Sequence, residues 1–325
     1  MSHRCIALCC QYNNSGDDIP GISFGETAEE TLTSFVGLRS DIIEKSMAGG
    51  SDKESSALIP GCAECGAFKL DEWPVSSGLI HSINLSMYPS VCQCKCIYCP
   101  LIEGKWGRYD KRLHSQIFEK LFDTITCAQK DGMIYKGAHW SISSGEIAVH
   151  PYRNKIFSLI EDYGNIAFHS NCFVFDQGIA DSLAKKPISS LNLSIDCGTR
   201  ETWRDVKGVD NFDEVIANLM RYSSICSRPD QIRLKYIVLP NVNSYREDYM
   251  EVIMLMKRLK IKHLTIASDM RYVYTMSGDQ KEELVACVGY MLALLNKYGL
   301  KYSTISMPGA GVTNNAFLYS KNIKI

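Results

Sequence analysis

The chain has 325 residues, of which 46% are hydrophobic and 22% are charged, so it can bury a large core and is not a disordered polymer. A formal net charge of −1 gives no electrostatic reason to expect a nucleic-acid partner. No run of about eighteen apolar residues occurs, so no membrane-spanning helix is predicted. The apolar stretch near the N-terminus is too short for a signal peptide, and we therefore expect a cytoplasmic protein with no membrane partner.

Strands and helices are predicted to alternate along most of the chain. Residues 11–58 are rich in Gly, Ser, Asp and Glu, and one helix is predicted within them, at residues 28–45. From Leu79 onward, short β-like runs are each followed by an amphipathic stretch, which is typical of βαβ units with a parallel sheet. The predicted strands are 79–87, 139–145, 165–171, 189–196, 231–239, 263–268 and 301–307. The predicted helices between them are 113–131, 153–163, 177–185, 245–259 and 278–298, with helical stretches across 200–222.

Six or seven such units favour an α/β fold, a partial or full parallel (β/α) barrel. We expect a cysteine-containing N-terminal extension at 1–78, the barrel at 79–307 and a C-terminal tail at 308–325. Chemistry in such a fold lies at the carboxyl ends of the strands. Polar residues follow those ends along the whole series: Ser144, Gly145, Glu146, His169, Ser170, Asn171, Ser194, Asp196, Asn241, Asn243, Ser268 and Asp269.

Cysteines are concentrated where the chain leaves the first predicted strand, in the segment CQCKCIYC at 92–99. Cys92, Cys96 and Cys99 have the spacing C-x3-C-x2-C. Three thiolates on one tight loop can bind three irons of a [4Fe–4S] cluster and leave the fourth iron open. With Cys94 included, the cysteines are too crowded for the usual structural zinc spacings. Cys94 is interpreted as a loop residue facing away, with a second-site ligand or a hydrogen-atom donor as the alternatives.

The motif resembles the C-x3-C-x-aromatic-C motif of the radical S-adenosylmethionine superfamily, with Tyr98 as the aromatic residue. SISSGE is similar to the family's Gly-Gly-Glu motif, which holds the methionine amino group, although Ser144 replaces the first glycine. LNLSIDCGTRETWRDVKG resembles the fourth-strand segment of peptide-modifying members, with Cys197 replacing the usual alanine. LKYIVLPNVN is similar to the fifth-strand pattern. The resemblance covers about residues 79–307.

The resemblance implies a [4Fe–4S] cluster held by Cys92, Cys96 and Cys99. It also implies that S-adenosylmethionine is cleaved by one electron to a 5′-deoxyadenosyl radical, which takes a hydrogen atom from a substrate C–H bond. The electron would come from a donor such as flavodoxin or ferredoxin. The residues implied to contact S-adenosylmethionine are Tyr98 (through its backbone, at the adenine), Ser144, Gly145, Glu146, Ser170, Asn171, Ser194 and Asp196.

Other cysteines raise two further hypotheses. Cys62 and Cys65 form a C-x2-C pair, a recurrent half-site for zinc or iron–sulfur, and Cys9 and Cys10 can supply two more thiolates. These four are candidate ligands of an auxiliary [4Fe–4S] cluster, with a zinc site or free thiols as the alternatives. Cys197 follows the fourth strand and is a candidate hydrogen-atom donor, as an epimerase would need, or else a structural thiol.

Three functions stay open from the sequence. A peptide or amino-acid residue is the favoured substrate, because the fourth-strand segment is closest to that group. The alternative is epimerisation or dehydrogenation of a carbohydrate or nucleotide-sugar. Lys235 and Arg271 are candidates for binding a substrate carboxylate or phosphate, and His169 for touching the substrate. A non-catalytic zinc- or cluster-binding interaction protein is the third reading, although such a protein has no use for Glu146 and Asp196.

Overall fold

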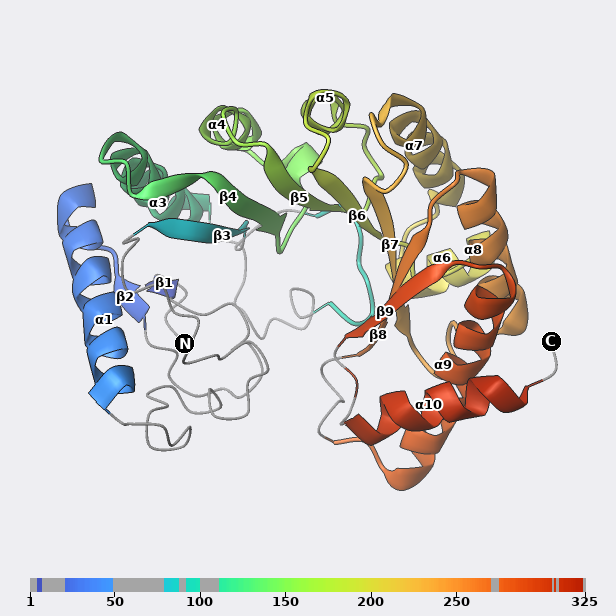
Figure 1. Cartoon of the computed structure of the whole chain (residues 1–325). Helices are drawn as coiled ribbons and strands as arrows, with labels where there is room; N and C mark the ends of the chain where they lie inside the picture. The colour runs from blue at the N-terminus through green and yellow to red at the C-terminus, as the bar shows by residue number, and fades with distance from the viewer. Residues whose placement is uncertain are drawn as a thin grey trace. The chain divides into compact units, whose positions relative to one another are not determined.

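The chain divides into two compact units, which are described separately. The computed structural model describes residues 5–7, 21–48, 79–87, 92–99, 111–269, 275–305, 307 and 310–323 (Figure 1). One unit comprises Met1–Ser82 and Asp110–Ala138, and the other comprises Ile83–Tyr109 and His139–Ile325. The division therefore falls within two strands, β3 (Ile80–Ser86) and β4 (Ile134–Ser143), and not at residue 78.

The first unit contains two short strands and two long helices. β1 (Cys5–Ala7) pairs with β2 (Gly21–Ser23) in antiparallel fashion, and α1 (Ala28–Ala48) packs against α3 (Lys111–Lys130). The N–H of Glu30 donates to Thr27 Oγ1 and the Glu30 carboxylate accepts from the Thr27 N–H, so a capping box starts α1. The sequence did not predict β1 and β2, because three residues are too few to show alternation.

Seven strands form one sheet in the order of the sequence. The order is β3, β4, β5 (Asn165–Ser170), β6 (Ser190–Ser194), β7 (Ile232–Val238), β8 (His263–Ser268) and β9 (Lys301–Ile305). Each neighbouring pair from β4 to β9 is parallel. Among the described strands, β3 and β9 are edges that do not pair with each other. The sheet is therefore open, which confirms the α/β fold in its partial-barrel form.

Helices lie between successive strands, as predicted. They are α4 (Arg153–Leu159), α5 (Gln177–Lys185), α6 (Arg200–Lys207), α7 (Phe212–Ile225), α8 (Arg246–Arg258) and α9 (Gly278–Lys297), with a 3₁₀ turn η2 (Ile147–Val149) after β4. The helical stretches predicted across 200–222 are two helices, and Gly208 ends α6 in the left-handed conformation at φ 66°. The predicted tail contains α10 (Ala310–Asn322), which packs along α9.

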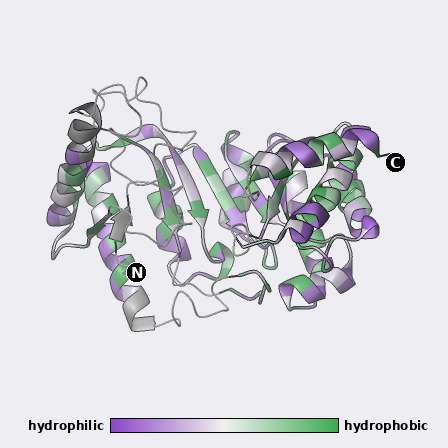
Figure 2. Ribbon diagram, turned by 90° about the horizontal axis from the view of Figure 1, so that it is seen from below, coloured by the Kyte–Doolittle hydropathy of each residue, from purple (hydrophilic) through white to green (hydrophobic). Residues whose placement is uncertain are grey.

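The two faces of the sheet differ in polarity, because side chains alternate along a strand. One face carries Trp140, Phe168, Leu193, Tyr236 and Ile266, all fully buried. Figure 1 shows α4, α5 and α7 along one side of β5 and β6, and Figure 2 shows hydrophilic and hydrophobic residues mixed along the strands. Within the described residues, no helix combines the length and apolarity needed to cross a bilayer.

Candidate cofactor-binding site

The segment 92–99, called the cysteine loop below, contains a tight turn. The N–H of Cys99 donates to the carbonyl of Cys96 over 2.9 Å, so Ile97 and Tyr98 are the two central residues of a hydrogen-bonded turn. A turn of this kind brings its first and last residues close together. The backbone therefore supports the predicted pairing of Cys96 and Cys99 at one site.

The end of helix α6 holds the loop through backbone hydrogen bonds. Lys95 N–H donates to Lys207 O over 2.8 Å, and Ile97 N–H donates to Val206 O over 3.0 Å. Directly after this contact, a Cβ added at Gly208 would lie 2.9 Å from the Cβ of Lys95. Because Gly208 also has a positive φ, a side chain there would be strained in both respects. Glycine lets α6 end against the loop.

The thiols of the loop interact with one another. The buried Cys94 thiol hydrogen-bonds to Cys92 and Cys96, so it lies between them and does not face away. The hydrogen bond with Cys94 is the main cause that lowers the pKa of Cys92. The other hydrogen bond of Cys94 is the main cause that lowers the pKa of Cys96, to about 6. The ammonium of Lys207 adds to the effect on Cys96. Iron is bound by thiolates, so the electrostatics of Cys92 and Cys96 fit an iron–sulfur ligand set.

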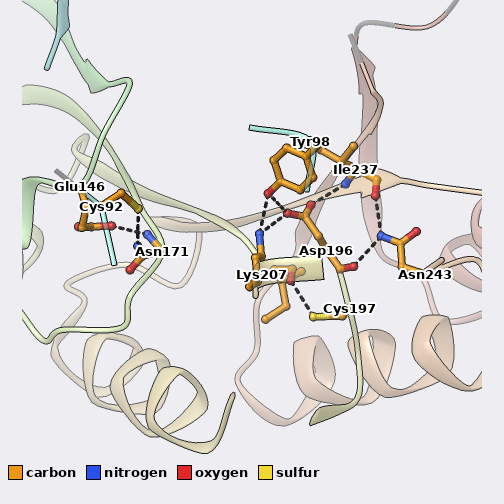
Figure 3. Close-up of polar contacts among 10 residues, drawn as sticks. Cys92, Tyr98, Glu146, Asn171, Asp196, Cys197, Lys207, Ile237 and Asn243 are labelled. Carbon is orange, nitrogen blue, oxygen red and sulfur yellow. Dashed lines mark hydrogen bonds and ion pairs between the residues drawn. The ribbon is translucent and has the colours of Figure 1, made fainter. Parts of the chain in front are cut away.

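Asp196 is the centre of a buried network beneath the loop (Figure 3). It follows β6 in the left-handed conformation at φ 55°, and its side chain is fully buried. One carboxylate oxygen accepts from Lys207 Nζ and from the Tyr98 hydroxyl, and the other accepts from the Ile237 N–H over 2.6 Å. Asn243 Nδ2 donates to the Asp196 carbonyl over 2.7 Å. Every acceptor of Asp196 thus has a protein partner.

Lys207 completes this network with a buried positive charge. Its Nζ donates to the Tyr98 hydroxyl over 2.7 Å and lies 5.1 Å from the centre of the Tyr98 ring. Burial opposes the charged ammonium, but the Asp196 carboxylate outweighs it, so the pKa of Lys207 is raised. Asp196 and Tyr98, both expected from the resemblance to contact S-adenosylmethionine, have their side chains engaged in fastening the loop. Ser194, two residues before Asp196, is half-buried and lies on the polar face of the sheet.

Glu146 occupies a second position, at the end of β4. Ser144 and Gly145 have φ angles of 60° and 144°, so the turn uses two consecutive positive-φ residues. This explains why glycine suits the position that Ser144 fills. The buried Glu146 carboxylate accepts from Ser170 Oγ over 2.9 Å and from the Asn171 N–H over 2.7 Å. Burial raises the pKa of Glu146 to about 7 against these donors.

Asn171 connects this carboxylate to the start of the cysteine loop. Its Nδ2 lies 3.4 Å from Cys92 Sγ, as Figure 3 shows. It also lies 3.4 Å from Gln93 Oε1. The structure therefore brings together four of the predicted site residues, Cys92, Glu146, Ser170 and Asn171. Cys92 is exposed, whereas Glu146 is buried behind it.

The remaining predicted cysteines are placed differently. Cys197 is fully buried, and its thiol donates to the Ile195 carbonyl over 3.1 Å, an arrangement typical of a structural thiol. Cys9, Cys10, Cys62 and Cys65 lie outside the described residues, as does Arg271. In the part of the chain that the structure describes, no three His, Cys, Asp or Glu side chains form a group that would hold a metal ion.

Sequence reasoning missed Lys207 and Asn243. Lys207 lies inside the fourth-strand segment that carries the resemblance, eleven residues after its ion-pair partner Asp196. A lysine on an amphipathic helix usually belongs to the solvated face, so its burial had no signal in the pattern. Asn243 was predicted as a polar strand-end residue. Its hydrogen bonds to the carbonyls of Asp196, just after β6, and of Ile237, in β7, were not predicted.

No protein-family model matches the chain, and no curated protein sequence matches it. Its fold is similar to that of SuiB from Streptococcus suis. SuiB bound to S-adenosylmethionine is 15% identical and has a TM-score of 0.53, over 92% of this chain and 69% of that chain. SuiB bound to the precursor peptide SuiA is 15% identical with a TM-score of 0.51, over 95% of this chain and 72% of that chain. The chain therefore shares its fold with a protein that was crystallised with S-adenosylmethionine, the cofactor that the cysteine motif implies.

Proposed function

We propose that the chain is a radical S-adenosylmethionine enzyme that removes a hydrogen atom from a substrate C–H bond. The observation that carries the proposal is the position of the cysteine loop. Its turn holds Cys96 and Cys99 at one site, while Cys92 lies beside Asn171 and the buried Glu146. The loop follows β3 and is flanked by the ends of β4 and β5, where a parallel α/β fold places its chemistry.

The donor set fits a [4Fe–4S] cluster. Cys92, Cys96 and Cys99 would hold three irons, and the lowered pKa values of Cys92 and Cys96 favour the thiolates that such a cluster needs. A reduced cluster supplies the electron that cleaves bound S-adenosylmethionine to a 5′-deoxyadenosyl radical. The protein's own task is to hold the loop, and the pairing of Lys95 and Ile97 with the end of α6 performs it.

Glu146 would receive the amino group of S-adenosylmethionine. Its carboxylate is fixed in direction by the Ser170 hydroxyl and by the backbone N–H groups of Ala148 and Asn171. Because the pKa of Glu146 is raised to about 7, a nearby ammonium group would favour its ionised form and be bound by it. Glu146 therefore matches the role that the family's Gly-Gly-Glu motif implies.

A peptide is the substrate class that we favour. SuiB, whose fold the chain shares at low identity, was crystallised with a precursor peptide. The fourth-strand segment of this chain also resembles that of peptide-modifying members of the family. No contact within the described residues favours a carbohydrate or nucleotide-sugar over a peptide.

The test is anaerobic incubation of purified protein with S-adenosylmethionine and dithionite. We expect release of 5′-deoxyadenosine and about four irons per chain, or about eight if the N-terminal cysteines hold a second cluster. The Cys92→Ala, Cys96→Ala, Cys99→Ala triple variant should release none, and Cys226→Ala, a half-buried cysteine on another element, should behave as the wild type. A colourless protein that forms no 5′-deoxyadenosine would instead indicate a binding scaffold.

A further inference from the structure

The polar face of the sheet, opposite the buried apolar face, carries a row of one lysine and three hydroxyl side chains across β6 to β9. Register places Ser194 of β6 beside Lys235 of β7, and Lys235 beside Thr265 of β8. Adjacent strands lie about 4.8 Å apart, so both hydroxyls neighbour the lysine side chain. Ser303 of β9 continues the row beside Thr265, with 3.2 Å between their Oγ atoms. A lysine flanked by two hydroxyl groups, with a third hydroxyl one strand further along, is the chemistry of an anion site.

The strands β4 to β9 present no acidic side chain beside Lys235 on this face. The residues that β4 to β9 present there include His139, His169, Arg233, Lys235, His263 and Lys301, but no Asp or Glu. Within the described residues, Lys235 Nζ has neither a hydrogen bond nor an ion pair. The Asp196 carboxylate acts on it electrostatically and favours the charged form, and the Lys207 ammonium that pairs with Asp196 opposes this to a smaller extent. Among the described residues, Lys235 is thus a half-buried positive charge with no carboxylate at ion-pair distance.

His169 of β5 lies on the same polar face, beside Asn192 of β6. Desolvation, aided by the Lys235 charge, lowers the pKa of its imidazole to about 4. The neutral ring contacts Ser141 over 3.4 Å, and Asn192 is half-buried. His169 and Asn192 therefore add neutral polar groups to the face that carries Lys235.

We propose that Lys235, with Ser194 and Thr265, binds an anionic group of the substrate, a carboxylate or a phosphate. That the bound anion belongs to a substrate rests on the proposed function, but anion binding at Lys235 does not. An ammonium that is half-buried without a partner costs desolvation free energy that a bound anion recovers. In a peptide substrate, such an anion would be an acidic side chain or the terminal carboxylate.

Equilibrium dialysis with inorganic phosphate, and separately with acetate, tests the site on the full-length protein. We expect the wild type to bind one of these anions, and Lys235→Met to weaken that binding by about tenfold or more. Lys235→Arg should retain it. Lys262→Met is the matched control, because it removes the same charge from an exposed lysine just before β8 and should leave the affinity unchanged. Equal affinity in Lys235→Met and the wild type would overturn the proposal, as would a wild type that binds neither anion.

A second measurement needs no variant. Burial lowers the pKa of Lys235, so more of its amine is neutral and reactive toward acetic anhydride. Mass spectrometry should show that phosphate or acetate slows acetylation of Lys235 and not of Lys262. Equal rates at Lys235 with and without the anion would count against the site, even if Lys235→Met failed to fold.

The methionine carboxylate of S-adenosylmethionine is the other source of the same chemistry. If Lys235 bound it, S-adenosylmethionine would compete with phosphate, and Lys235→Met would weaken S-adenosylmethionine binding by about tenfold. Our proposal requires phosphate to bind the S-adenosylmethionine-loaded protein and the affinity for S-adenosylmethionine to be unchanged. Protein that binds phosphate but forms no 5′-deoxyadenosine would refute the proposed function and leave the anion site intact.

Discussion

The two ends of the cysteine loop differ in how they are held. The end that contains Tyr98 lies on a buried network in which Asp196 and Lys207 are completely paired. The end that contains Cys92 is exposed and meets the sheet through the side chain of Asn171 at 3.4 Å (Figure 3). One end is built as a support, and the other leaves polar groups at the surface for a ligand.

This difference shows that one motif contains residues that support the loop and residues that are left to bind a ligand. Tyr98 and Asp196 belong to the same pattern as Cys92 and Glu146, yet their side-chain polar atoms bind other groups of the protein. A buried ion pair contributes little net stability, but losing one partner is costly because a bare charge stays behind. Mutations at the end that contains Tyr98, called the support end below, should therefore lower stability. Mutations at the end that contains Cys92, called the open end below, should instead weaken ligand binding.

The largest expected effect is at the open end. Replacing Cys92 by serine should abolish iron binding by the loop, since serine does not replace a thiolate ligand, and with it all 5′-deoxyadenosine formation. Stability of the metal-free protein should be unchanged, because Cys92 is exposed. Iron analysis and urea unfolding of the same preparation measure both. Retention of about four irons by Cys92→Ser would remove Cys92 from the ligand set.

The next effect is at the support end. Lys207→Met leaves the Asp196 charge buried and unpaired, and should lower the free energy of unfolding by about 3–5 kcal/mol. Asp196→Asn in the same chain should recover part of the loss. Arg200→Met removes an arginine of the same helix whose ion pairs, with Asp210 and Asp213, are exposed, and should cause no measurable change. Urea unfolding that ranks Lys207→Met with Arg200→Met would show that the network does not stabilise the fold.

A pH effect of on the order of 2 kcal/mol is expected from Glu146. Its pKa is raised to about 7 by burial, so between pH 5 and 7 the folded state binds more protons than the unfolded chain. Stability from this group is therefore present at low pH and is lost as the pH rises through 7. Glu146→Gln should lack this slope.

The difference in unfolding free energy between wild type and Glu146→Gln, measured from pH 5 to 8, isolates this term. His169 acts in the opposite sense in both proteins: its pKa is lowered to about 4, so its contribution rises with pH between about 4 and 6.5. Because His169 is common to both, the subtraction removes it. A difference that does not change with pH would mean that Glu146 is not desolvated.

The smallest effect is expected from Tyr98→Phe. It removes one hydroxyl from the network but keeps the ion pair between Asp196 and Lys207, so it should cost about 1 kcal/mol in unfolding free energy. Tyr245→Phe removes an exposed hydroxyl that donates to the Asn241 carbonyl over 3.2 Å, and serves as the control. A loss as large as that of Lys207→Met would show that the hydroxyl, and not the ion pair, holds the loop.

Much of the fold was predictable because its signals are local. The helix predicted at 177–185 is found at Gln177–Lys185, where the Asp176 carboxylate caps its first turn. The strand at 263–268 is also found as predicted. The helical stretches predicted across 200–222 are found as two helices, but the end of the first was not predicted, because Gly208 inside a helical pattern reads as a tolerated glycine until its φ angle is known.

The sequence by itself determined the order of strands and helices, the spacing of the three cysteines and the polar residues at the strand ends, since each depends on residues close together in the chain. The tertiary structure alone decided that Asp196 supports the loop, that Cys197 is buried and that Lys235 lies between Ser194 and Thr265. Those facts depend on which side chains meet from distant segments. Burial and electrostatic pairing are properties of that meeting and leave no periodic trace in the sequence.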